Sequence, residues 1–485
     1  MRLSTKIAYN TIIQVLGKVI STILALLTIA IITRELGQTG FGEYTTIMTF
    51  VSFFAIAADL GLTLITVQQI SQPNADEKYI LGNLFSLRLL SAIFILGIAP
   101  LAVLFFPYDN IIKIGVLISS FSFLFIALNQ ILVGLFQKKL RMDKVTIAEI
   151  ISRLFLFFGA LLAFKLGYKL ISIIFITALS SFINFIFHYY FSQKYTRIKL
   201  LFDFAYWKKI ILISWPLALT ITLNLIYLKT DTLLLSLIQR PSTIGILAEV
   251  GLYGAAYKVI DVLITFPFMF AGIILPILTA VWAEKDLINF KKILQKSFDA
   301  LALIIVPIII GAQFTAGKIM DVVAGESFFD SGKILQILIL ACGMIFMGNI
   351  LAHTIIVIEK QKNIIGAYFF TAITSVIGYF LFIPKYSYYA AAWVTVYSES
   401  VIAIASGYLV WKYSRFIPNF KITVKSFLSS LPMAIFLFLN QTKSVYFLIP
   451  VSIVIYLLFI YITRAITKEE IFEILNIKKN EKPAN

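Results

Sequence analysis

The sequence is short of the residues on which much soluble-protein chemistry depends. Of its 485 residues, one is a cysteine (Cys342) and two are histidines (His188 and His353). A single cysteine excludes an internal disulfide and a cysteine cluster, and two histidines exclude a three-histidine zinc site. Charged residues make up only 13% of the chain, about half of their usual share in a soluble domain. A disulfide-stapled secreted domain and a charge-rich disordered regulator are thereby excluded.

Motifs for nucleotide and sugar chemistry are missing as well. The phosphate-binding loop G-x-x-x-x-G-K-[ST] has no match, because the upstream glycine is absent before Gly17-Lys18, Gly317-Lys318 and Gly332-Lys333. No Asp-x-Asp occurs, and serine, histidine and carboxylate never converge in a known catalytic spacing. We therefore expect no enzymatic activity, no ATP hydrolysis, no cofactor and no metal.

Apolar residues are what the chain has in excess. They make up 60% of it, against about 45–50% in a soluble domain, so the surplus must face lipid. A membrane span needs about 20 mostly apolar residues. Such runs predict fourteen helical spans, at 9–33, 44–67, 80–106, 111–136, 145–165, 168–191, 210–238, 250–281, 299–317, 334–358, 364–384, 388–411, 427–441 and 445–463.

The basic residues predict the orientation of these spans. The formal net charge is +17, with 41 Lys and Arg. The terminal segments and alternate loops hold 27 of them, the opposite loops hold nine, and five lie inside spans. Short basic loops stay in the cytoplasm, so we predict a multi-pass protein of the cell membrane with both termini cytoplasmic. Most of the charge is then explained by topology, and no nucleic-acid partner is expected.

The longest linker divides the spans into six and eight. It covers 192–209 and mixes five basic residues with apolar ones, which favours an interfacial helix, with an ordinary basic loop as the alternative. Segments 282–298 and 468–480 have the same character. The predicted organisation is an N-lobe at 1–191, a cytoplasmic interfacial linker at 192–209, a C-lobe at 210–411, two further spans at 412–465 and a cytoplasmic tail at 466–485.

A short sequence repeat supports two halves. Phe41-Gly42-Glu43-Tyr44 opens the second span of the first half, and Val250-Gly251-Leu252-Tyr253 opens the second span of the other. Membrane transporters are often built from repeated halves. The shared pattern is only apolar-Gly-x-Tyr, so a chance glycine at a helix start is the alternative.

Ionisable residues inside spans are the main candidates for function, because each costs about 2.5–3.5 kcal/mol at mid-bilayer on insertion scales. Glu149 and Arg153 are four residues apart and are expected to pair within one helix. The full set is Lys18, Asp59, Arg88, Glu149, Arg153, Lys229, Asp231, Lys258, Asp261 and Glu399.

Polar positions line up on helix faces near these charges. Asn10, Gln14 and Lys18 are spaced by four residues on the first span. In the second half, Asn224 shares a face with Asp231.

The eighth span carries its own polar stripe. Tyr257 lies on it with Asp261, and Lys258 lies beside it. Each half thus supplies one lysine-bearing and aspartate-bearing helix pair. Lys18 with Asp59, and Lys258 with Asp231, are predicted either to line a cavity or to form buried ion pairs.

The sequence resembles the O-antigen and polysaccharide flippases. The resemblance rests on Asn10 and Gln14, Arg34-Glu35-Leu36-Gly37, Gly40-Phe41-Gly42-Glu43-Tyr44, Ala58-Asp59-Leu60-Gly61-Leu62, Ser214-Trp215-Pro216, Asn224 to Asp231, and the run from Val250 to Lys258. It covers the whole chain in length and layout. The implied fold is all-α, with two six-helix lobes in a V around a central cavity and two C-terminal helices.

The resemblance implies a flippase that moves polyprenyl-pyrophosphate-linked oligosaccharide across the membrane by alternating access, for surface polysaccharide such as O-antigen. Cationic side chains would hold the pyrophosphate by charge-assisted hydrogen bonds. The candidate substrate-binding residues are Lys18, Asn10, Gln14, Arg88, Lys229, Lys258, Asn224 and Tyr257. The candidate sites for a coupling ion, H⁺ or Na⁺, are Asp59, Asp231, Asp261 and Glu399.

Two other functions remain open. A cation-coupled multidrug exporter of the same superfamily would more naturally carry acidic residues in its first span, where this chain has Lys18, although Asp59, Asp231 and Asp261 favour it. A membrane glycan polymerase or ligase is the third candidate, and the absence of a long acidic outer loop counts against it. The expected partners are the lipid-linked oligosaccharide and membrane lipids, and we expect a monomer.

Overall fold

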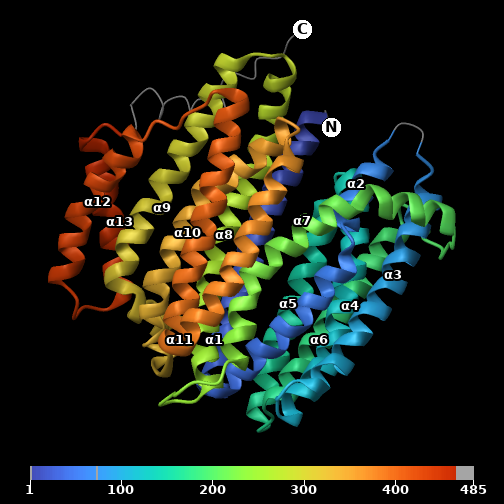
Figure 1. Cartoon of the computed structure of the whole chain (residues 1–485), viewed down its shortest axis with the longest axis horizontal. Coiled ribbons are helices and arrows are strands. Elements are labelled where there is room, and N and C mark those ends of the chain that lie inside the picture. The colour runs from blue at the N-terminus through green and yellow to red at the C-terminus, as the bar shows by residue number, and fades with distance from the viewer. Residues whose placement is uncertain (1–2, 73–74, 466–485) are drawn as a thin grey trace. The chain divides into compact units, whose positions relative to one another are not determined.

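The computed structural model describes residues 3–72 and 75–465, and these residues form helices and no β-strand. Figure 1 shows the chain from blue at its N-terminus to red near its C-terminus. The elements are α1 (Leu3–Asp59), α2 (Leu62–Ile70), α3 (Glu77–Ala102), η1 (Val103–Phe105), α4 (Asn110–Lys138), α5 (Met142–Lys165), α6 (Leu170–Gln193), α7 (Phe204–Leu237), α8 (Ile246–Ala283), α9 (Leu287–Ala324), η2 (Glu326–Phe328), α10 (Ser331–Val357), α11 (Gln361–Ser414), α12 (Lys421–Leu439) and α13 (Val445–Ile462).

The predicted all-α, multi-pass fold is confirmed. Among the described residues, 11 helices are long and apolar enough to cross a membrane. Two of them each contain two predicted spans, because the backbone leaves helical geometry in the middle: α1 at Gly37 (φ 65°, ψ −175°) and α11 at Ser387 (φ 51°, ψ −134°). The predicted span at 210–238 corresponds to α7.

The chain forms two compact units. The first contains residues 1–255, 322–328 and 368–394, and the second contains 256–321, 329–367 and 395–485. Each is described separately below. The predicted division into lobes at 1–191 and 210–411 stays a prediction.

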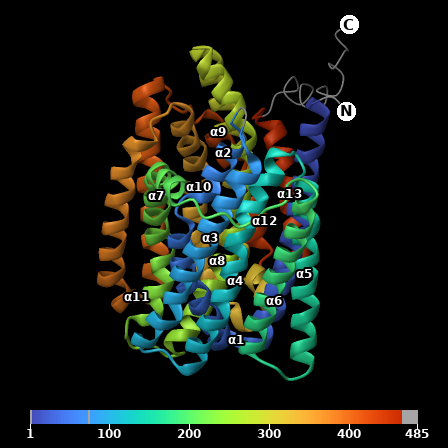
Figure 2. The same cartoon turned by 90° about the vertical axis from the view of Figure 1, so that its right-hand side faces the viewer.

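The first unit is built around α1 and α3 to α6. Helix α4 packs against α6 and α3, while α1 packs against α5 and α4; α4, α5 and α6 run alongside one another in Figure 2. Close packing rests on small residues, as expected where lipid removes the hydrophobic drive for helix association. A Cβ on Gly115 of α4 would lie 2.4 Å from Cδ1 of Ile47 on α1, so only glycine fits there without a shift.

Of the two alternatives for 192–209, an interfacial helix or an ordinary loop, the loop describes most of the linker between α6 and α7. Residues 194–203 are not helical, and α7 begins only at Phe204. The physical reason lies in α3, whose polar side chains satisfy the backbone of the linker. Ser86 Oγ accepts from the amide of Leu201 (3.0 Å) and Asn83 Oδ1 accepts from the amide of Asp203 (2.9 Å).

Aspartates cap the helices at this end of the unit. Asp76 accepts from the amides of Lys78 and Tyr79 at the start of α3, and Asp203 accepts from the amide of Tyr206 at the start of α7 (3.0 Å). The hydroxyl of Tyr79 also donates to Asp203 (2.5 Å). That hydrogen bond lowers the pKa of the exposed Asp203 carboxyl below its ordinary value.

In the second unit α12 and α13 form a pair that packs against α9. The hydroxyl of Tyr456 on α13 donates to the carbonyl of Leu303 (2.7 Å) and also contacts the hydroxyl of Ser426 on α12 (2.8 Å). Segment 282–298, expected to be interfacial, is the end of α8, a short turn and the start of α9. The corresponding expectation for 468–480 falls outside the described residues.

Candidate functional site

The break between α1 and α2 positions one of the predicted charges. Helix α1 ends at Asp59, Leu60 and Gly61 take positive φ values of 50° and 72°, and α2 resumes at Leu62. The carboxylate of Asp59 therefore projects from a helix end. Facing it on α3 is Arg88, which is only 2% exposed.

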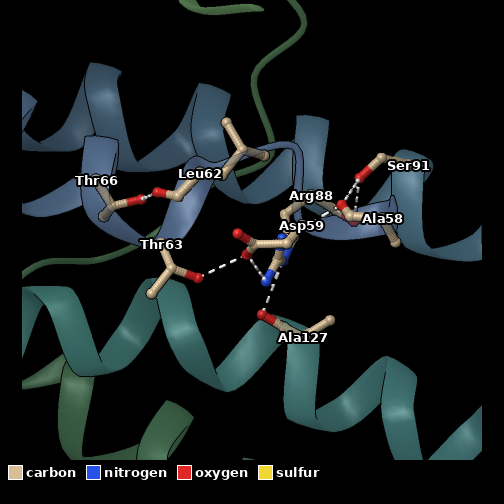
Figure 3. A network of polar contacts seen from close by, with 8 residues as sticks. All are labelled: Ala58, Asp59, Leu62, Thr63, Thr66, Arg88, Ser91 and Ala127. Carbon is tan, nitrogen blue, oxygen red and sulfur yellow. Dashed lines mark hydrogen bonds and ion pairs between the residues drawn. The ribbon is translucent and has the colours of Figure 1, made fainter. Parts of the chain in front are cut away.

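Arg88 and Asp59 form a buried ion pair with a full set of acceptors (Figure 3). Arg88 Nη2 lies 2.5 Å from Asp59 Oδ1. Its Nε donates to the carbonyl of Ala127 on α4 (3.1 Å) and its Nη1 to the carbonyl of Ala58 (3.2 Å). Thr63 on α2 donates to the same carboxylate oxygen (2.6 Å). All three guanidinium nitrogens are thus engaged, and the arrangement joins α1, α2, α3 and α4.

Of the two alternatives for Lys18 and Asp59, a cavity lining or a buried ion pair, the ion pair is wrong, because Asp59 pairs with Arg88. Pairing follows proximity in space, and Arg88 of α3 is the cation that lies next to Asp59. Lys18 itself lies on α1, half-buried, next to Gly17, where a Cβ would come within 2.1 Å of the Thr146 side chain of α5.

The polar face predicted for the first span lies on α1. Gln14 is exposed and Lys18 is half-buried, while the side chain of Asn10 lies outside what the structure describes. Among the described residues Lys18 makes no ion pair. The Lys18 ammonium is therefore the charged group on this helix face that could bind a ligand.

A second set of predicted residues lies along α7. Asp231 is fully buried, and its Oδ2 accepts from the hydroxyl of Tyr253 on α8 (2.5 Å). Asn224 donates to the hydroxyl of Tyr227 (2.7 Å). Lys229 is half-buried and acts electrostatically on Asp231. These residues belong to the first compact unit.

The remaining predicted residues lie in the second unit. Lys258 Nζ is 3.5 Å from Asp261 Oδ2, one helical turn along α8, and both side chains are about one-third exposed. Three residues make about one helical turn, so the two side chains meet on one face of the helix. A pair of Lys258 with Asp231, one of the two alternatives, would join the two units and stays a prediction. Tyr257 is half-buried, and Glu399 on α11 is 8% exposed.

The expected pair on α5 is present. Arg153 Nη2 lies 3.1 Å from Glu149 Oε1, with both side chains about 30% exposed. The spacing of four residues on one helix was sufficient to predict it.

A neutral polar network in α4, α5 and α6 escaped the sequence reasoning. Asn129 donates to Asn184 Oδ1 (2.8 Å), and Asn184 donates to Ser152 Oγ (3.0 Å). Ser180 donates to the carbonyl of Ser152 (2.7 Å), and His188 Nδ1 contacts the carbonyl of Asn184 (2.9 Å). The signal is in the sequence, since Ser180, Asn184 and His188 are spaced by four on α6, but this helix carries no Lys, Arg, Asp or Glu to mark it.

These sites share a chemical character. Charges inside the helices are held by a neighbouring helix, as Arg88 holds Asp59, or by a residue one turn away, as Arg153 holds Glu149. Hydroxyl groups supply further hydrogen bonds, as Tyr253 does to Asp231. Among the described residues no group of three His, Cys, Asp or Glu could hold a metal ion. An all-helical, multi-pass chain with charges inside its spans has the architecture of membrane transporters.

The particular family follows from the sequence. The family described as "Polysaccharide biosynthesis protein" matches residues 7–282, more than half of the chain. The chain belongs to this family. The sequence matches no curated protein.

Solved structures share the fold. The lipid II flippase MurJ in an inward closed conformation superposes with a TM-score of 0.75 at 16% identity, covering 96% of this chain and 99% of that one. A multidrug resistance MATE transporter of the MOP superfamily, in its inward-facing conformation, gives 0.65 at 13% identity, covering 89% and 99%. A MOP superfamily transporter from Pyrococcus furiosus gives 0.56 at 12% identity, covering 84% and 94%. At these identities the likeness shows the fold.

Proposed function

We propose that this protein is a flippase that translocates polyprenyl-pyrophosphate-linked oligosaccharide across the cell membrane by alternating access, for the synthesis of a surface polysaccharide such as O-antigen or lipopolysaccharide. The observation that carries the proposal is the family match over 7–282. The likeness in fold to MurJ, a lipid II flippase, supports it.

The charge pattern suits an anionic headgroup. A pyrophosphate needs cationic donors that are not already saturated by protein partners. Lys18 has no ion-pair partner among the described residues, and Lys258 holds Asp261 loosely at 3.5 Å. We assign these two lysines the principal contacts with the pyrophosphate. The further proposed substrate contacts are Asn10, Gln14, Arg88, Lys229, Asn224 and Tyr257.

Arg88 is the proposed contact whose hydrogen-bond donors are least available to a substrate. It is buried, and its nitrogens are committed to Asp59 and two backbone carbonyls. In the proposal it contributes by holding the α1–α2 break in place, so its effect on the substrate runs through the position of α1.

An H⁺ or Na⁺ gradient is the proposed driving force, with Asp59, Asp231, Asp261 and Glu399 as coupling sites. Glu399 fits a proton best. It is 8% exposed and has no ion pair among the described residues, and an unpaired carboxylate in a low-dielectric interior favours its neutral, protonated form.

A cation-coupled multidrug exporter is the second candidate. The fold likeness to MATE transporters supports it, and so does the fully buried Asp231. A membrane glycan polymerase or ligase, the third candidate, has no support from the described residues. We place the protein in the cell membrane as a monomer with both termini cytoplasmic.

The decisive experiment compares lysine variants in proteoliposomes. Lys18→Ala and Lys258→Ala are each expected to slow flipping of a fluorescent polyprenyl-pyrophosphate oligosaccharide by about tenfold or more, since a hydrogen bond to a charged group is worth about 1.5–3 kcal/mol. Lys333→Ala is the matched control, because that side chain is 67% exposed and about 4.0 Å from its partner Asp330. It should transport at the parental rate.

The opposite pattern would overturn the assignment. If both lysine variants flip the glycolipid normally but lose efflux of a cationic dye, the exporter is the correct reading.

A further inference from the structure

The two glycines of the sequence repeat meet in the first compact unit. Gly42 lies on α1 just beyond the break at Gly37, and Gly251 lies near the start of α8. A Cβ on Gly42 would lie 1.7 Å from the carbonyl oxygen of Leu247, and a Cβ on Gly251 would lie 2.0 Å from the carbonyl oxygen of Gln38. Backbone therefore touches backbone at this point, which we term the glycine crossing (Gln38, Gly42, Leu247 and Gly251).

The crossing is reciprocal. Gln38 precedes Gly42 by four residues, and Leu247 precedes Gly251 by four residues. The Cβ position of each glycine therefore faces the carbonyl of the residue that lies one helical turn before the other glycine. The Cβ position of each is also 3.1 Å from the amide nitrogen of the other glycine. Exchanging the two segments reproduces the same contacts, as a two-fold axis between repeated halves would.

The buried ion pairs form within 1–191 or within 210–411, and neither of them joins these two parts of the chain. The Arg240–Glu249 ion pair measures 2.5 Å, with exposures of 1% and 8%, and Ser387 donates to the same carboxylate (2.5 Å). All three residues come from 210–411. The Arg88–Asp59 network comes entirely from 1–191.

The polar contacts that join 1–191 to 210–411 near the crossing are weaker than these ion pairs, and apolar side chains such as Leu247 pack beside them. Arg34 donates to the carbonyl of Val322 (2.7 Å) and Gln38 to the carbonyl of Ser327 (2.5 Å), and both hydrogen bonds are exposed. Water can replace exposed hydrogen bonds at little cost. Phe41 and Phe328 meet edge to face at 5.9 Å.

One buried hydrogen bond also joins the two parts. The hydroxyls of Tyr108 and Ser236 lie 2.6 Å apart. Loss of a single neutral hydroxyl pair is a small cost beside the two buried ion pairs that stay intact.

We propose that the glycine crossing is the closure of one side of the transport path, and that Gly42 and Gly251 part when this side opens. The inference rests on the proposed function as an alternating-access transporter. Glycine permits closure because two helix backbones approach without interlocking side chains, and Cα–H···O contacts of this kind are weak enough to separate. The basic-residue pattern puts this side on the outer face.

A disulfide across the crossing tests whether it must separate. A Cβ on Gly254 would lie 3.2 Å from Cβ of Thr45, close to the separation that a disulfide needs. In a Cys342→Ser background, the pair Thr45→Cys with Gly254→Cys should cross-link on oxidation. Glycolipid flipping should stop and should return on reduction. Full transport by the cross-linked protein would overturn the proposal.

Labelling provides a second test that needs no substrate. Thr46 is fully buried, one turn beyond Gly42, so Thr46→Cys should react slowly with a membrane-impermeant maleimide. Adding Gly42→Ala or Gly251→Ala forces the backbones apart and should speed labelling by about tenfold. Gly97→Ala is the matched control, because nothing lies within 4 Å of its Cβ position. It should leave the rate unchanged.

The two tests separate the inference from the proposed function. Equal labelling rates in all three alanine variants would overturn the closure. Faster labelling in the two crossing variants, with no flipping of glycolipid by the parent protein, would support the proposed closure. The same result would contradict the proposed substrate.

Discussion

Removing Arg88 while keeping Asp59 tests the central network of α1 to α4. Arg88→Met leaves the Asp59 carboxylate, whose side chain is 15% exposed, with Thr63 as its remaining side-chain donor. Breaking a buried ion pair from one side costs about 3–5 kcal/mol, because the remaining charge stays desolvated. We therefore expect Arg88→Met to lower the free energy of unfolding by about that amount.

Variants of Asp59 test whether the lost ion pair causes this destabilisation. Asp59→Leu leaves the Arg88 guanidinium, whose side chain is 3% exposed, without its counter-ion and should cost a similar amount. The double variant Arg88→Met with Asp59→Leu removes both charges and should recover most of the loss, since apolar replacements of a buried pair are often neutral. Arg88→Met, Asp59→Leu and the double variant form a double-mutant cycle with the parent, from which the coupling of the pair follows.

The measurement is thermal unfolding in detergent, followed by loss of the monodisperse peak on size exclusion. The ordering expected is Arg88→Met and Asp59→Leu least stable, then the double variant, then the parent. If Arg88→Met unfolds within about 0.5 kcal/mol of the parent, as surface substitutions do, Arg88 is not a structural residue. Its donors would then be available to a ligand, and its loss should show only in transport.

Three further outcomes are expected. Glu249→Gln should destabilise the protein in thermal scans by about 3 kcal/mol, because Arg240 is only 1% exposed and would lose its counter-ion. Asp203, whose pKa is lowered by the Tyr79 hydroxyl, contributes stability above its ordinary pKa of about 3.9, and this is lost as pH falls through the lowered value. Scans between pH 5 and pH 3 should show a smaller loss in Tyr79→Phe. Asn184→Ala should cost about 1–3 kcal/mol by leaving buried groups unsatisfied; an unchanged midpoint would show that water replaces the amide.

Helices and local pairs were predictable because their causes are local. A run of about 20 apolar residues specifies a span whatever its neighbours. The predicted spans therefore fall inside observed helices to within a few residues, except 44–67, which is broken at Leu60 and Gly61 between α1 and α2. Glu149 and Arg153 pair because four residues make one turn. The conformation of the linker at 194–203 was not predictable, because its cause is not local. It depends on Ser86 and Asn83 of α3, which lie more than a hundred residues away.

Partners in space were not predictable from periodicity. A Lys18–Asp59 pair was one of two alternatives, based on depth along the helices, but Asp59 pairs with Arg88 of α3. The repeat glycines Gly42 and Gly251 were recognised as a pattern, while their contact could not be inferred from either segment alone. Where two helix backbones touch, the only sign in the sequence is the glycines themselves.

The reciprocal glycine crossing also limits how the sequence can diverge. A buried side chain that grows can usually be accommodated by a neighbour that shrinks, so paired substitutions leave the volume unchanged. At Gly42 and Gly251 no such exchange exists, because each already faces a backbone carbonyl and neither can become smaller. We expect the two positions to stay glycine in descendants of this chain, even where the surrounding helices change almost every other residue.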